Sequence, residues 1–118
     1  MVQIRNRNFN KEVLKCGLPV LACFTVEWSP SSYITCLLAE ELAKKYDGKV
    51  KFVKIDIEES PEVSTRYKVV AVPTIVLFRD SQPLKRLIGF QDWRSLKRLV
   101  ESVTEQKELP YPENRRFT

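Results

Sequence analysis

Residues 27–36 read Glu27-Trp28-Ser29-Pro30-Ser31-Ser32-Tyr33-Ile34-Thr35-Cys36 and join the two segments that decide the fold. The residues before them, 19–26, are apolar and rich in β-branched and aromatic side chains, which predicts a buried strand. The residues after them place apolar or small side chains every three or four positions, which predicts an amphipathic helix from about Ser31 to Tyr46. A loop between a strand and a helix N-terminus is where α/β proteins place chemistry, because free N–H groups and the helix dipole meet there.

Strand and helix patterns continue to alternate on both sides of this stretch. Short strands are expected at residues 2–5, 50–55 and 74–78, and residues 84–88 should return antiparallel to the last of these. Helices are expected through Val13 and Leu14, after Ser60-Pro61, and after Asp92, a residue suited to capping. A strand, a helix and a strand in this order imply a right-handed parallel βαβ unit. The order predicts an α/β protein with no internal repeat.

The segment Trp28-Ser29-Pro30-Ser31-Ser32 resembles the active-site segment of the thioredoxin family, whose pattern is Trp-Cys-x-x-Cys. The resemblance extends over most of the chain and implies a thioredoxin fold, with a central mixed β-sheet flanked by helices on both faces. It implies one thioredoxin-like domain over residues 1–104, followed by a proline-containing C-terminal tail, 105–118. The family's two redox cysteines fall at Ser29 and Ser32, so its catalytic positions hold serine.

The resemblance also implies a binding groove. Val72-Pro73-Thr74 is similar to the family's cis-proline segment, which faces the active-site loop, and Gly89 matches a glycine of the groove. In the family this groove holds an extended polypeptide by a form of strand addition. The residues expected to line it are Trp28, Pro30, Ser31, Val72, Pro73, Gly89 and Phe90. The alternative for Trp28 is that it only packs over the start of the helix.

Other positions depart from the family pattern. Cys23 stands where the family has a buried aspartate, Leu37 where it has a helix-kinking proline, and Tyr33 where it has a basic residue. Ser81 stands where it has a turn glycine, whereas Lys54 matches a lysine in the strand beneath the active site. The helix after the active-site loop is therefore expected to run straighter than in the family.

The serines cannot replace the missing cysteines. Disulfide reduction needs a thiolate and a second thiol, and a serine hydroxyl has no redox couple. The chain contains no histidine that could act as a general base for a serine nucleophile. The favoured role for Ser31 or Ser32 is therefore to cap the helix.

The three cysteines match no zinc or disulfide spacing. Cys23 on the predicted central strand and Cys36 one helical turn beyond Ser32 are expected to approach one another below the active-site loop. One hypothesis is a displaced buried dithiol; the alternative is two inert, buried small hydrophobes. Cys16, near a helix end, is expected to be incidental.

Three functions remain open. The first is a thioredoxin-like protein without the redox dithiol that binds proteins or peptides. The second is a thiol–disulfide oxidoreductase, a protein-disulfide reductase, whose Cys-Pro-Ser-Cys pair has been replaced by serine. The third is unusual redox activity from Cys23 and Cys36. The several departures from the family pattern favour the first.

Composition limits the remaining classes of function. The 118 residues carry a formal net charge of +5, but the basic residues are scattered, so no nucleic-acid partner is expected. No apolar run is long enough to span a membrane, and no secretory signal is recognised, so we predict a cytoplasmic protein. We also expect it to be a monomer. The isolated glycines argue against nucleotide cofactors, and the missing histidines against a metal site, so no cofactor and no metal are expected.

Overall fold

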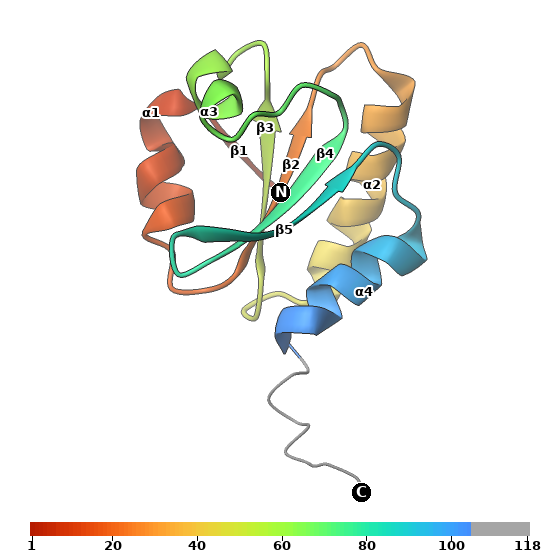
Figure 1. Cartoon of the computed structure of the whole chain (residues 1–118). Helices are drawn as coiled ribbons and strands as arrows, with labels where there is room; N and C mark the ends of the chain where they lie inside the picture. The colour runs from red at the N-terminus through yellow and green to blue at the C-terminus, as the bar shows by residue number, and fades with distance from the viewer. Residues whose placement is uncertain (105–118) are drawn as a thin grey trace, which may run out of the picture.

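A five-stranded mixed sheet forms the centre of the structure, a computed structural model that describes residues 1–104 (Figure 1). The strands follow the order β1-β3-β2-β4-β5; β1 and β2 each pair parallel to β3, whereas β4 pairs antiparallel to β2 and to β5. The expected tail, 105–118, lies outside the described residues. The strand bounds are β1 (Val2–Ile4), β2 (Val20–Thr25), β3 (Lys51–Asp56), β4 (Thr74–Arg79) and β5 (Gln82–Ile88).

Helices cover both faces of the sheet, which confirms the predicted architecture (Figure 1). One face carries α2 (Pro30–Lys45) and α4 (Trp93–Thr104). The other carries α1 (Asn6–Phe9), its π-helical continuation η1 (Asn10–Leu14), and α3 (Pro61–Arg66). The expected short N-terminal helix is thus present, with a change of winding inside it.

Side chains of the central strands divide between two cores according to strand alternation. In β2, Leu21 and Cys23 pack toward α2 and α4, whereas Ala22 and Phe24 pack toward α1 and α3. Both sets are buried, and every residue of β2 is buried. The continuous apolar run at 19–26 follows from this arrangement, because a strand covered on both faces needs no polar side.

Helix α2 begins at Pro30, slightly earlier than expected, and runs for 16 residues without interruption past Leu37. Proline at the first helical position lacks only an N–H that the helix would leave unpaired. Leu37 keeps the backbone N–H that a proline would remove, so the ladder of hydrogen bonds can continue through this point. The helix therefore starts at the loop that the sequence singled out and extends along the sheet.

Strand β5 forms the outer edge of the sheet and is exposed along most of its length. The turn before it holds Asp80 and Ser81 at φ 52° and 70°, the left-handed region that a glycine would adopt more easily. The Ser81 hydroxyl donates a hydrogen bond to the Leu14 carbonyl at 2.7 Å. The pairing of β4 with β5 shifts register between Leu77, whose partner is Lys85, and Phe78, whose partner is Pro83.

Candidate functional site

Three loops meet at one end of the sheet because the strands that carry them are in register there. Phe24 near the end of β2 pairs with Thr74 at the start of β4, and Thr74 pairs with Ile88 at the end of β5. The loop into α2, the segment before β4 and the segment after β5 therefore lie at the same end of the sheet. Of the residues predicted to line a groove, Trp28, Val72, Pro73, Gly89 and Phe90 lie in these three segments, and Pro30 and Ser31 begin α2.

Ser29 is the N-cap of α2. Its backbone is extended (φ −94°, ψ 117°), and its Oγ accepts a hydrogen bond from the backbone N–H of Ser32 at 3.3 Å. Its own carbonyl accepts from the N–H of Tyr33 at 3.0 Å. The expectation that Ser31 or Ser32 caps the helix is wrong, because Pro30 takes the first helical position and leaves the residue before it as the cap. The cap thus occupies the position of the family's first redox cysteine.

Ser32 lies fully buried inside the first turn of α2. Its Oγ has no hydrogen-bond partner among the described residues, whereas the Oγ of Ser31 lies 3.4 Å from that of Ser29. The sequence contains no histidine that could act as a general base for either serine. The two hydroxyls offer a helix cap and a buried polar group, and neither can exchange electrons with a disulfide.

The segment before β4 lies at the same end of the sheet as the loop into α2. The Val72–Pro73 peptide bond is cis, and the Pro73 carbonyl accepts a hydrogen bond from the N–H of Gly89 at 2.8 Å. Gly89 has φ +88°, a conformation that side-chain-bearing residues rarely adopt, so glycine suits this close tie between loops. The hydrogen bond fixes the segment after β5 against the proline.

Large apolar side chains project into solvent around this end of the sheet. Trp28 is 71% exposed and Phe90 is 53% exposed, so Trp28 is not buried over the helix start. The Trp28 Nε1–H donates to the Glu58 carboxylate at 3.3 Å, which orients the indole. The sequence reasoning missed that contact, and it also missed Val70 and Ile88, which are exposed as well. The position of Ile88 could have been predicted, because it ends the strand that leads directly to Gly89 and Phe90.

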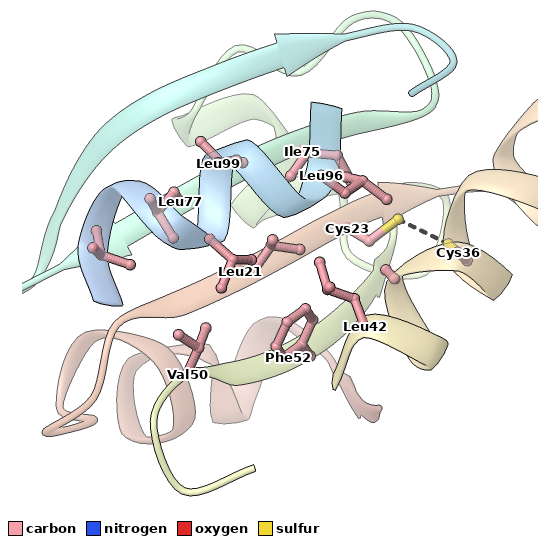
Figure 2. Close-up of a cluster of buried hydrophobic side chains, with 13 residues drawn as sticks. Leu21, Cys23, Cys36, Leu42, Val50, Phe52, Ile75, Leu77, Leu96 and Leu99 are labelled. Carbon is pink, nitrogen blue, oxygen red and sulfur yellow. Dashed lines mark hydrogen bonds between the residues drawn. The ribbon is translucent and has the colours of Figure 1, made fainter. Parts of the chain in front are cut away.

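Cys23 and Cys36 lie side by side, as Figure 2 shows. Their Sγ atoms are 2.8 Å apart, one on β2 and the other on α2, and both side chains are buried. Either sulfur could donate the hydrogen bond between them, and this bond lowers the pKa of Cys36; Thr25 and Lys54 lower it further, against the effect of burial. The same contact and full burial raise the pKa of Cys23 well above its ordinary value.

A cavity of about 340 Å³ reaches Cys36 from the side of the sheet. Lys54 is on its wall and is also the register partner of Cys23 across β2 and β3. The sequence analysis did not identify Thr25 and Asp56 as site residues. They are the last residues of these two parallel strands, so they lie at the same end of the sheet. The prediction that both residues end neighbouring parallel strands could have placed them together. The cavity is lined by Gln3, Thr25, Val26, Glu27, Tyr33, Cys36, Lys54 and Asp56.

Cys16 is separate from the other two thiols. It packs against the core cluster on the opposite face of the sheet, beside η1. Across residues 1–104, no three or more cysteine and acidic side chains are grouped so as to hold a metal ion. No helix in that range is both long and apolar enough to cross a membrane.

Comparison with known proteins agrees with this geometry. Residues 1–102 match the family model described as Thioredoxin. The chain is 36% identical over 94 residues to a protein named Thioredoxin from Rickettsia bellii (strain RML369-C), covering 79% of this chain and 89% of that protein. It is 30% identical over 101 residues to a Thioredoxin from Staphylococcus saprophyticus, covering 86% of this chain and 95% of the relative.

Proposed function

Because the chain belongs to the thioredoxin family, we propose that it is a protein thiol–disulfide oxidoreductase in which serine replaces the reactive cysteines at positions 29 and 32. The observation that carries the proposal is the cap at Ser29. Its Oγ accepts a hydrogen bond from the N–H of Ser32 in the first turn of α2, so the position keeps a helix N-terminal donor for a reactive cysteine. A thiolate there would be stabilised by the same N–H and by the helix dipole.

The chain with serine at both positions does not turn over disulfides there, because neither hydroxyl can form a mixed disulfide. What remains is the groove. Trp28 and Phe90 expose apolar area beside it, and aromatic side chains commonly anchor protein contacts. Binding of proteins or extended peptides without chemistry is therefore the second candidate function. The proposal includes a monomeric protein in the cytoplasm that acts on such partners.

The test is insulin disulfide reduction with dithiothreitol as electron donor. With the parent chain, insulin should be reduced no faster than by dithiothreitol alone, because positions 29 and 32 hold serine. Ser29→Cys/Ser32→Cys should raise the rate clearly above that background. Ser29→Cys alone is the matched control, because it lacks the second thiol that resolves the mixed disulfide and should stay close to background.

Failure has a defined meaning. If Ser29→Cys/Ser32→Cys folds, as judged by circular dichroism, but its rate of insulin reduction stays at background, the oxidoreductase hypothesis is wrong. The peptide-binding hypothesis then takes its place. Direct titration of an extended peptide then tests that reading, with binding by the parent chain as the supporting result and no binding as the contradicting one.

A further inference from the structure

The buried sulfur pair forms a chemical site that the groove does not use. The two Sγ atoms are 2.8 Å apart, against about 2.05 Å in a disulfide bond, so a small shift would allow the bond to form. We propose that Cys23 and Cys36 are a dithiol site that reduces small hydroperoxides such as hydrogen peroxide and closes to an internal disulfide. The proposal does not rest on the proposed function, because no step involves Ser29, Ser32 or the residues around Pro73.

Access assigns different roles to the two sulfurs. Cys36 lines the cavity of about 340 Å³ and is 8% exposed, whereas Cys23 lies behind it at 0%. An oxidant that enters the cavity therefore meets Cys36 first. Cys36 is the attacking thiol, and Cys23 is the thiol that resolves the product.

The cavity favours a small polar oxidant over a polypeptide disulfide. The ends of β2 and β3 and the first turns of α2 enclose Cys36, and polar side chains of Thr25, Tyr33 and Lys54 line the approach. A disulfide of a folded partner would have to bring its own backbone past these elements, whereas a hydroperoxide is smaller than any side chain on the wall. The Lys54 ammonium can also donate hydrogen bonds to peroxide oxygens.

Ionisation supports the same assignment. The hydrogen bond with Cys23 lowers the pKa of Cys36, and Thr25 and Lys54 act in the same direction. The thiolate is the nucleophilic form of cysteine, so the more accessible sulfur is also the more reactive one. Cys23 holds its proton, which is then available for the second step.

The reaction balances in two steps. The Cys36 thiol first loses its proton to solvent, and its thiolate attacks one peroxide oxygen; an S–O bond forms, the O–O bond breaks, and the departing hydroxide combines with that proton as water. The Cys23 sulfur then attacks the Cys36 sulfenic acid; the S–S bond forms, the S–O bond breaks, and the second hydroxide leaves with the Cys23 proton as water. Two thiols lose two electrons in total, and one hydrogen peroxide becomes two waters. A small dithiol reduces the disulfide again and is itself oxidised.

The experiment counts thiols after peroxide treatment. The reduced full chain, freed of reductant, receives an equimolar amount of hydrogen peroxide; it is then denatured, alkylated and weighed by mass spectrometry. The three thiols should fall to one, and a peptide map should link Cys23 to Cys36. Dithiothreitol should restore all three. Three alkylated thiols under these conditions, or a link that includes Cys16, would overturn the proposal.

Variants separate the roles of the two thiols. Cys16→Ser is the matched control and should leave closure of the pair unchanged. Cys36→Ala should keep both remaining thiols alkylatable, whereas Cys23→Ala should leave a sulfenic acid on Cys36 that dimedone traps. Equal dimedone labelling in Cys23→Ala and Cys36→Ala would contradict the assignment. Closure of the parent chain by oxidised glutathione but not by peroxide would do the same, and this readout needs no variant that folds.

Discussion

Ser29 and Ser32, three residues apart, are both buried but differ in hydrogen bonding. Ser29 caps α2, whereas the Ser32 Oγ is buried without a partner in the described part of the chain. Ser29→Ala should therefore lower the free energy of unfolding by about 1 kcal/mol, the usual value of an N-cap. Ser32→Ala should leave it unchanged or raise it by up to about 1 kcal/mol, because it removes an unsatisfied buried group. Urea denaturation of the two variants, each as the other's control, measures the difference.

The reverse order of stabilities would contradict this account. If Ser32→Ala cost as much as Ser29→Ala, the Ser32 hydroxyl would have a hydrogen-bond partner in solution, and the cap would not be at Ser29 alone.

At the residue scale, the sequence predicted the site positions better than their contacts. The resemblance placed Ser29, Ser32 and Cys36 along the start of one helix, and the structure has them there. It could not choose the cap among three nearby serines, although Pro30 held the signal through its preference for the first helical position. The contact from Trp28 to Glu58 was beyond reach, because it joins residues 30 positions apart.

At the scale of elements, Asp92 sets the start of α4. Its carboxylate accepts a hydrogen bond from the backbone N–H of Ser95 at 2.9 Å, and this bond lowers the pKa of Asp92. A carboxyl with a lowered folded pKa stabilises the protein above its unfolded pKa, about 3.9, and loses that contribution as pH falls through the folded value. Asp92→Asn keeps a capping side chain but removes the titration.

The prediction concerns the difference between the two proteins. Urea unfolding from pH 7 down to pH 2 should show the parent chain losing stability relative to Asp92→Asn below about pH 4. Two stability curves that stay parallel across that range would show that the carboxylate makes no charge-dependent contact with the helix.

The elements themselves were largely predictable because each carries a strong local pattern. The apolar run at 19–26, the stripe through α2 and the capping residue Asp92 give β2, α2 and α4. The change from α1 to η1 at Asn10 was not predicted, since π-helical winding depends on packing rather than on a local residue preference. The cavity beside Cys36 was missed because it needs the register of β2 against β3.

At the scale of the whole molecule, aromatic packing joins the N-terminal helix to the sheet. The Phe9 ring lies 5.5 Å from Tyr67 and 5.7 Å from Phe78, centroid to centroid, and Phe9 is buried. Phe9→Ala should lower the free energy of unfolding by about 3–5 kcal/mol, through lost burial and the cavity left behind. Phe90→Ala, at an exposed ring, is the matched control and should change it by less than about 0.5 kcal/mol.

The two phenylalanines should also differ in function. Phe90→Ala in the Ser29→Cys/Ser32→Cys background should raise the KM for insulin while the fold stays intact, if the groove is the substrate site. Similar losses of stability in both variants, measured by urea denaturation, would contradict the division between core and groove.

The two edges of the sheet bear on self-association into fibrils. A fibril grows when a flat, unpaired strand templates the next copy. The β5 edge interrupts such a template with Pro83, with the shift in register and with the charges of Lys85 and Arg86, while β1 at the other edge spans three residues. Neither edge offers a continuous ladder of free backbone groups, so lateral growth of the sheet should be slow even when the protein is concentrated.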